Sequence, residues 1–177
     1  MEARKKPSKG RTPQEMAELV RAHSDELVRY AFCMVGEVNA AEEVVLDAMA
    51  AYVVRSENKA LPVTYLWRMV HSRSMDYLRH HRRHVALEAV ADVMASGQDV
   101  EADALRAERK RVLYRCILQL PADYGHVVYL RYLQDFTAEE TARIMDKSVK
   151  QVYNLLFRAK AVLKEALLRE GYDDEDL

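Results

Sequence analysis

The stretch FTAEETARIMDKSVKQVYNLLFRAK, residues 136–160, decides the fold of this chain. Thr137 precedes Glu140 by three positions, which is the spacing of a capping box, where each side chain bonds the backbone N–H of the other residue at a helix start. Ser148 and Gln151 repeat this spacing further along the chain. The two starts define a short helix, a turn and a longer helix. The stretch therefore predicts a helix-turn-helix.

The second of these helices has one apolar and one polar side. Its apolar residues recur at helical spacing and are expected to face a core: Val149, Val152, Leu156, Ala159 and Leu163. The opposite side carries Lys150, Gln151, Asn154 and Arg158. Gln and Asn bind adenine edges in a major groove, whereas Lys and Arg bind guanine or phosphate. Because any surface helix has a polar side, these residues alone leave both DNA binding and a plain solvated surface open.

Helix starts of the same kind recur through the rest of the chain. They are Thr12 with Glu15, Asn39 with Glu42, Pro62, and Leu120-Pro121. Gly36 is expected to end the first helix. Nowhere does hydrophobicity alternate with the two-residue period of a strand. With only 5 Gly and 4 Pro, loops are scarce, and the predicted fold class is all-α.

The 177 residues carry a net charge of -1, but the charges are unevenly spread. Residues 1–84 hold 14 Lys and Arg against 11 Asp and Glu, and residues 110–168 hold 10 against 6. Acidic residues prevail in 85–109, with 6 against 2, and in 169–177, with 5 against 1. The near-neutral total therefore does not exclude a DNA-binding protein.

The expected organisation is two small helical domains joined by a flexible linker. The segment ASGQDVEAD, residues 95–103, has the weakest helical pattern in the interior. The predicted parts are a disordered basic arm over 1–12, an N-terminal domain over 13–84, an acidic linker over 85–107, a C-terminal domain with the helix-turn-helix over 108–171, and an acidic tail over 172–177.

Several classes of protein are disfavoured by the sequence. No apolar run approaches the ~18 residues of a membrane span, and the polar N-terminus lacks the apolar part of a secretory signal. A cytoplasmic protein without membrane insertion is expected, with Cys33 and Cys116 as reduced core thiols. His80, His81 and His84 have no partner at ligand spacing, which disfavours a metal site. No phosphate-binding loop or nucleophile motif indicates an enzyme or a cofactor.

The helix predicted from Pro62 interleaves aromatic and basic side chains. It carries Tyr65, Trp67, Arg68, Arg73 and Tyr77, and it ends in the basic run Arg79–His84. Rings that stack on bases and cations that hold the backbone suit single-stranded nucleic acid. The alternative is that the rings lie in the core and the charges form a solvated helix end that opposes the helix dipole.

The segment Leu120–Leu167 resembles the promoter-binding C-terminal domain of extracytoplasmic-function (ECF) sigma factors. The likeness runs without a gap through Arg131-Tyr132, Glu140, Ala142, Ser148, Val152, Leu156 and Arg158-Ala159-Lys160. Residues 18–84 resemble the other domain of the family, through Tyr65-Leu66-Trp67-Arg68-Met69-Val70 and Met75-Asp76-Tyr77-Leu78-Arg79. The resemblance implies a promoter-specificity subunit of bacterial RNA polymerase with no catalytic activity of its own.

The resemblance also implies three sets of functional residues. Those expected to dock on core RNA polymerase are Glu42, Glu43, Leu46, Asp47 and Met49. Those expected to bind the melted −10 element, together with the 55–61 loop, are Asn58, Lys59, Trp67, Arg68, Ser72, Arg79, Arg82 and Arg83. Those expected to read the −35 element in duplex form are Lys150, Gln151, Asn154, Arg158 and Lys160. The implied partners are polymerase, promoter DNA and an anti-sigma factor.

The chain departs from the family's pattern at each of these sites. The departures are Leu46-Asp47, Met49 and Ala51 in the docking segment, Ser72 and Arg73 in the −10 helix, Asp146 at the turn glycine, and Tyr153, Leu155 and Phe157 at commonly basic positions. Two other hypotheses therefore stay open. One is a sigma-like mimic that binds an anti-sigma factor, or a helix-turn-helix regulator independent of polymerase. The other is an enzyme or metal protein that uses the His and Cys residues.

Overall fold

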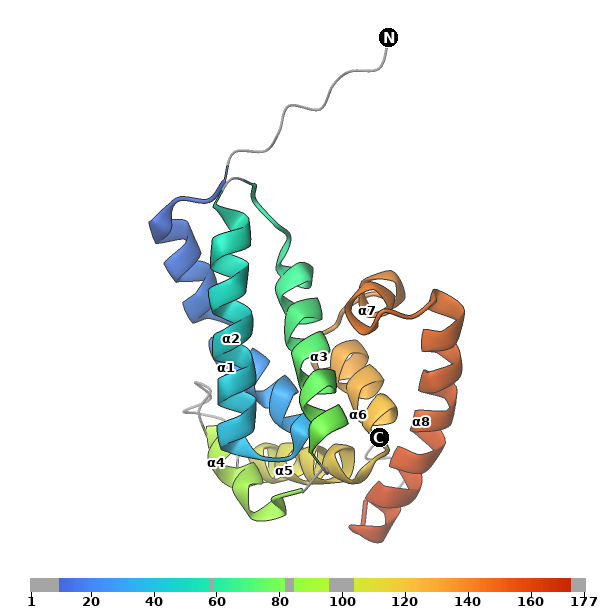
Figure 1. Ribbon diagram of the computed structural model, residues 1–177. Helices are drawn as coiled ribbons and strands as arrows, with labels where there is room; N and C mark the ends of the chain where they lie inside the picture. Colours follow the sequence, from blue (N-terminus) through green and yellow to red (C-terminus); the bar gives the residue numbers. More distant parts are fainter. Residues whose placement is uncertain (1–9, 58, 82–84, 96–103, 173–177) are drawn as a thin grey trace.

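The computed structural model describes residues 10–57, 59–81, 85–95 and 104–172, and its regular structure there is helical, with no strand. In chain order the elements are α1 (Pro13–Val35), α2 (Val38–Ser56), α3 (Val63–His80), η1 (Leu87–Ala89), α4 (Val90–Ala95), α5 (Ala104–Gln119), α6 (Ala122–Val128), η2 (Tyr129–Leu133), α7 (Ala138–Met145) and α8 (Val149–Arg169). Figure 1 shows α1, α2 and α3 side by side, with α6, α7 and α8 opposite them and α5 beneath. The predicted all-α class is confirmed.

Three of the predicted capping boxes are present in the structure. The Thr12 hydroxyl accepts a hydrogen bond from the Glu15 N–H at 3.2 Å, and the Glu15 carboxylate accepts one from the Thr12 N–H at 2.8 Å. The other two boxes are Thr137 with Glu140 at α7 and Ser148 with Gln151 at α8. Each box satisfies two backbone N–H groups that the first helical turn leaves without a partner.

The predicted cap at Asn39 is wrong. α2 begins at Val38 after Glu37, and no side chain bonds the backbone at this start. Gly36 ends α1 with a φ of 83°, the left-handed conformation that glycine adopts without steric cost. Glu37 is extended, with a φ of −134°. Because these two residues already reverse the chain, the helix starts before Asn39, which lies exposed in the first turn.

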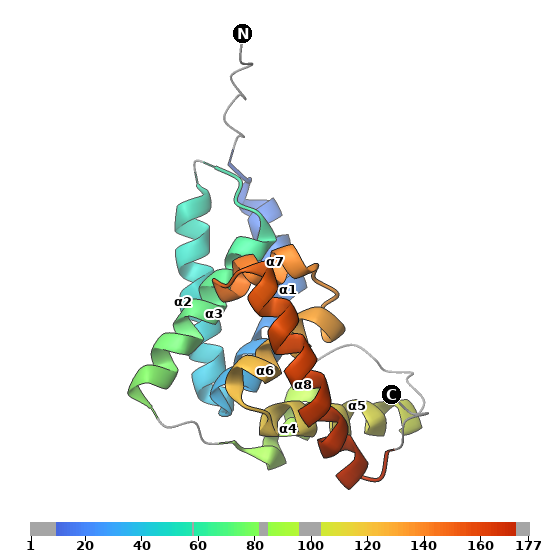
Figure 2. The ribbon, with the colours of Figure 1, turned by 90° about the vertical axis from the view of Figure 1, so that its right-hand side faces the viewer.

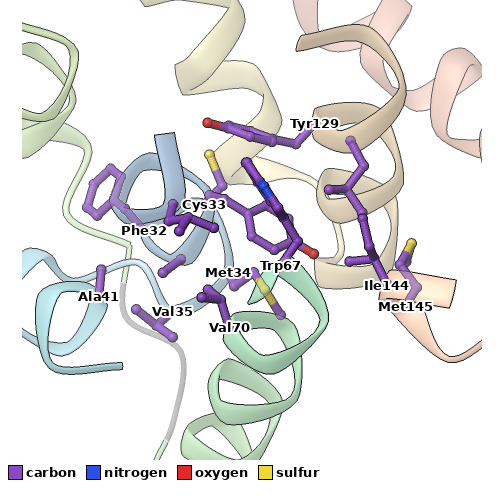
Figure 3. Close-up of a cluster of buried hydrophobic side chains, with 14 of the residues drawn as sticks. Phe32, Cys33, Met34, Val35, Ala41, Trp67, Val70, Tyr129, Ile144 and Met145 are labelled. Carbon is purple, nitrogen blue, oxygen red and sulfur yellow. The ribbon is translucent and has the colours of Figure 1, made fainter. Parts of the chain in front are cut away.

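A single hydrophobic cluster joins the N-terminal and C-terminal halves of the chain. The ring of Trp67 in α3 has its centre 5.3 Å from that of Tyr30 in α1 and 5.2 Å from that of Phe136, just before α7. Figure 3 shows Trp67 among side chains of α1, with Tyr129 and Ile144 of the C-terminal half on its other side. In this structure the two predicted domains therefore pack on one continuous core.

The first part of the predicted acidic linker is folded, which corrects that expectation for residues 85–95. η1 and α4 lie within it, and Val90 and Val93 are 3% and 5% exposed. Their spacing of three residues places both valines on one side of α4 against the core, whereas Glu88 is exposed. Residues 96–103 lie outside the described part of the chain.

The two predicted tails also fall partly outside the described residues. Of the arm over 1–12, the structure describes residues 10–12, and it shows them held against the protein: the Arg11 side chain donates to the Tyr52 hydroxyl and to the Leu61 carbonyl. Of the acidic tail over 172–177, the structure describes Tyr172 only. The arm is therefore ordered at the residues that precede α1.

Candidate nucleic-acid interface

The helix-turn-helix is formed by α7, a three-residue turn and α8. Asp146 ends α7 in the left-handed conformation, with a φ of 54°, and the Lys147 N–H donates to the Ala142 carbonyl at 2.9 Å. Asp and Asn tolerate this conformation better than other non-glycine residues, so a turn without glycine is possible here. Ser148 then caps α8. Figure 2 shows α8 lying across the face of the C-terminal half that is turned to the viewer.

The two sides of α8 are divided as the sequence pattern predicts. Val152 and Ala159 are fully buried, and Leu156 is 7% exposed. The predicted DNA-contacting residues all lie exposed: Lys150, Gln151, Asn154, Arg158 and Lys160. This polar side of α8 faces away from the core and is accessible in the structure.

A surface groove runs along this polar side. It has a volume of about 240 Å³ and is lined by Lys147, Gln151, Asn154, Leu155 and Arg158. α8 has no Asp or Glu before Glu165. The partial positive charge of the helix N-terminus adds to its cations. The groove therefore combines amide and cationic groups, of which Lys147 is paired with Asp123 at 3.3 Å, and such a lining suits a nucleic-acid edge and its phosphates.

Lys160 has a different setting from the other predicted contacts on α8. Its ammonium group lies 5.3 Å from the ring centre of Tyr132, in the range of a cation–π contact. Tyr132 is 48% exposed. Lys160 is therefore held at the flank of α8 over this ring, beside the groove rather than in its lining.

One exposed face of α3 gathers the described members of the predicted −10 set. Arg68, Ser72 and Arg79 recur at helical spacing and are exposed. Arg68 forms an ion pair of 2.8 Å with Asp146, in the turn of the helix-turn-helix, and Arg79 is paired with Asp76. Lys59 is exposed in the loop before α3, whereas Asn58, Arg82 and Arg83 lie outside the described residues.

The outer side of α2 presents four of the five predicted docking residues. Glu42, Glu43 and Asp47 are exposed, and Leu46 is 67% exposed. About two turns further along α2, Val53 and Val54 are also exposed. An apolar row with acidic neighbours is thus left without a covering element in the described structure.

Comparisons with known proteins show that the chain is similar to sigma factors. The domain family "Sigma-70, region 4" matches residues 110–163, from α5 through most of α8. The ECF RNA polymerase sigma factor SigM of Bacillus subtilis (strain 168) is 27% identical over 162 residues, which cover 89% of this chain and 98% of SigM. The chain is thus similar to ECF sigma factors over most of its length, and residues 110–163 match the region 4 family.

Two solved structures of protein complexes contain a chain that shares this fold. CnrH in complex with the cytosolic domain of CnrY has a TM-score of 0.64 at 20% identity and covers 91% of this chain and 92% of its own. The sigma factor RpoE in complex with the anti-sigma factor NepR, from Bartonella quintana, has a TM-score of 0.60 at 18% identity and covers 87% and 94%. The fold likeness therefore extends over both halves.

Two of the site residues expected from the sequence are buried. Trp67 is 1% exposed, and Met49 is 6% exposed. Trp67 shares its side of α3 with Val70 and packs on Tyr30, so in this arrangement it cannot stack on a base. Met49 shares the inner side of α2 with Val45. For both residues the core interpretation replaces the contact that was expected.

Several exposed residues were not assigned to the interface from the sequence. Phe157 is 81% exposed and Tyr153 57% exposed, one turn apart on the outer side of α8. Their exposure could have been predicted from the sequence, because their helical spacing from the apolar residues of α8 places them on the side away from the core. Arg11 had no such signal, since its partners Tyr52 and Leu61 are distant in the sequence.

Two histidines and both cysteines are buried in the core. His71 and His126 are buried where the two halves meet, with ring centres 5.4 Å apart. Both cysteines are buried thiols, and burial raises the pKa of Cys116. Within the described residues no three His, Cys, Asp or Glu side chains gather as metal ligands, and none of the helices there is both long and apolar enough to span a bilayer.

Proposed function

We propose that this chain directs promoter-specific transcription initiation by core RNA polymerase, in which it reads the −35 element through α8 and the −10 element through α3. One observation carries this proposal. The second helix of the helix-turn-helix presents a groove of amide and cationic groups to solvent, in a chain that is similar to ECF sigma factors. Such a helix fits the major groove of duplex DNA.

Different residues of α8 would make different kinds of contact with the DNA duplex. Gln151 and Asn154 offer amides to base edges, and Lys150 and Arg158 offer cations to guanine or phosphate. The exposed rings of Tyr153 and Phe157 offer apolar contacts of the kind that thymine methyl groups make. A recognition surface that mixes these three chemistries discriminates among all four base pairs.

The −10 and polymerase contacts are proposed on the other two surfaces. The exposed face of α3, with Arg68, Ser72 and Arg79, would hold the backbone of the opened strand together with Lys59. The outer side of α2 would dock on polymerase, because Leu46, Val53 and Val54 expose several apolar side chains on one helix, and apolar patches with polar rims mark contact surfaces. Trp67 and Met49 are left out of both sets.

The proposed role needs no catalysis by the chain itself, because polymerase performs the chemistry. It also places the protein in the cytoplasm, where polymerase and promoter DNA are found. We further propose an anti-sigma factor as a regulatory partner, since RpoE, whose fold this chain shares, was solved with the anti-sigma factor NepR.

The test is reconstitution with core RNA polymerase. The purified chain should co-purify with core polymerase and should direct run-off transcripts from genomic fragments that core polymerase alone ignores. If it does neither, while a second sigma factor activates the same polymerase, the proposed function is wrong. Binding of an anti-sigma factor without polymerase binding would instead support a sigma mimic.

Two substitutions on α8 test the −35 assignment. Arg158→Ala and Asn154→Ala should each weaken binding of the −35 duplex by about 1–3 kcal/mol, because each removes hydrogen bonds to a base or phosphate. Association with polymerase should stay unchanged. Arg169→Ala, in the last turn of α8, is the matched control. Loss of polymerase binding with normal DNA binding would show that the recognition face is misassigned.

A further inference from the structure

Contacts with residues outside the connection between α2 and α3 maintain the conformation of this connection. Tyr52, on α2, donates its hydroxyl to the Leu61 carbonyl at 2.6 Å. Arg55 donates to the Tyr65 hydroxyl at 2.7 Å, which ties the end of α2 to the start of α3. The described loop residues between these ties include Lys59, which is exposed. The flanks are thus fixed while the loop surface stays accessible.

Arg11 is the third anchor, and it comes from a distant part of the chain. One guanidinium nitrogen, Nη1, donates to the Leu61 carbonyl at 2.6 Å and to the Tyr52 hydroxyl at 2.9 Å. Leu61 therefore receives two hydrogen bonds, one from α2 and one from the residues before α1. A carbonyl has two lone pairs, so both are used. Because the guanidinium is charged, its bond is stronger than a neutral one.

The residue before Arg11 contacts the other end of the loop. A Cβ atom on Gly10 would lie 2.2 Å from the Glu57 carbonyl oxygen, closer than any such contact allows. Only glycine fits there without a shift of backbone. Gly10 and Arg11 thus contact the loop at Glu57 and at Leu61, its two ends, by two independent means.

The position of Arg11 is itself fixed by the helix that follows. Thr12 is the N-cap of α1, and its capping box with Glu15 sets the backbone directly after Arg11. The backbone from which the guanidinium reaches Leu61 is therefore already ordered. Forming this hydrogen bond costs less conformational entropy than it would for a side chain on a mobile segment. Lysine at this position would offer a point charge without the rigid, planar group.

We infer that Arg11 is a positioning residue of the −10 site, which holds the Leu61 end of the loop and the start of α3 in the conformation that receives an unpaired base. This rests on the proposed function of α3. A base leaves its stack at a cost of a few kcal/mol, so a receiving loop that is already ordered lowers the remaining cost of capture. Arg11 touches the loop rather than the DNA.

The first test measures loop order in the full chain without DNA. Backbone order parameters of Lys59, Ala60 and Leu61 should lie near 0.85 in the wild type and fall below about 0.6 in Arg11→Met. Tyr52→Phe, which removes the hydroxyl but keeps the buried ring, should have a smaller effect. Arg21→Met, at an exposed arginine of α1, is the matched control and should match the wild type. Unchanged order in Arg11→Met would overturn the inference.

The second test measures promoter opening by the holoenzyme. The probe is a genomic fragment recovered in the reconstitution above, with 2-aminopurine in its −10 element. Arg11→Met should lower opening about tenfold at limiting holoenzyme, since a hydrogen bond to a charged group is lost. Arg11→Lys should recover part of it. Affinity for the −35 duplex and for core polymerase should not change.

The outcomes of the second test separate the inference from its premise. If wild-type holoenzyme opens no fragment, the proposed function fails. If the wild type opens the promoter and Arg11→Met opens it equally well, the positioning role is wrong. If Arg11→Met weakens −35 and polymerase binding as much as opening, Arg11 supports the fold generally, which also overturns the inference.

Discussion

At the residue scale, His71 is a buried histidine whose pKa is changed strongly by folding. Its Nδ1 lies 2.9 Å from the Tyr30 hydroxyl, and its ring meets His126 edge-on. Burial lowers the pKa of His71 from 6.5 to about 4, against the opposing charge of Asp123. Burial also raises the pKa of Tyr30, so the phenol keeps its proton, and a hydrogen bond joins its hydroxyl group to Nδ1 of His71.

The lowered pKa of His71 predicts a loss of stability in mild acid. Between pH 6.5 and 4, His71 is protonated in the unfolded chain and neutral in the folded chain. The free energy of unfolding therefore falls as the pH is lowered. The contribution is about 2–3 kcal/mol between pH 7 and pH 4.5. Urea unfolding at the two pH values measures it. His71→Gln should show a pH dependence smaller by this amount, because Gln does not titrate.

The control for this prediction is His80→Gln, at an exposed histidine on the last turn of α3. It should keep the pH dependence of the wild type. An identical pH dependence in wild type and His71→Gln would show that His71 takes up its proton as readily in the folded chain as in the unfolded one, and the junction between the halves would then be more hydrated than the structure indicates.

At the scale of elements, the helix starts differ in how they are stabilised. α1, α7 and α8 each have a reciprocal capping box, whereas α2 starts without a side-chain cap. α2 is instead placed by the left-handed Gly36 and by the burial of Val45 and Ala48 on its inner side. Packing alone can therefore set a helix start when the preceding turn is tight.

This difference predicts opposite effects of two similar substitutions. Ser148→Ala should lower the free energy of unfolding by about 1 kcal/mol, because the N–H of Gln151 loses its acceptor. Asn39→Ala should cost nothing, or stabilise slightly, since Asn39 is exposed within a helical turn and alanine is the better helix former. Urea unfolding of both variants, with circular dichroism, measures the effects. A loss at Asn39 equal to that at Ser148 would mean that α2 is capped by Asn39 in solution.

At the scale of the whole molecule, the compact arrangement bears on how two DNA elements could be bound. A compact chain of this length has a radius of gyration of about 16 Å. Elements named −10 and −35 lie about 25 base pairs, or roughly 85 Å, apart on straight B-DNA. One compact body cannot reach both, so the proposed function requires α3 and α8 to separate. The ion pair of Arg68 with Asp146 and the packing of Trp67 on Phe136 would then break.

Separation of the halves is measurable by energy transfer between dyes. Cysteines introduced at the exposed Glu18 of α1 and Glu165 of α8 can be labelled selectively, because both native cysteines are buried. We expect high transfer efficiency in the isolated protein and a marked drop when core polymerase and a promoter fragment are added. Addition of bovine serum albumin is the control. Unchanged transfer in an active complex would contradict the separation.

Much of the architecture follows from local patterns. Capping boxes, glycine stops and apolar stripes act over three to seven residues, so they predicted the all-α class, the helix-turn-helix and the two sides of α8. Leu46 and Arg68 were named through the resemblance to ECF sigma factors, and the structure shows both side chains exposed. Sequence could not decide Trp67, because an aromatic ring among basic residues is equally compatible with stacking on bases and with a core.

What the sequence by itself determined is the set of helices and the polar side of the recognition helix, because hydrogen bonding and periodicity within one helix are local. Only the tertiary structure decided that Trp67 belongs to the core, that α4 fills part of the linker, and that Arg11 holds Leu61. These depend on contacts between residues tens of positions apart. Such contacts are set by how whole helices pack, and no local pattern encodes them.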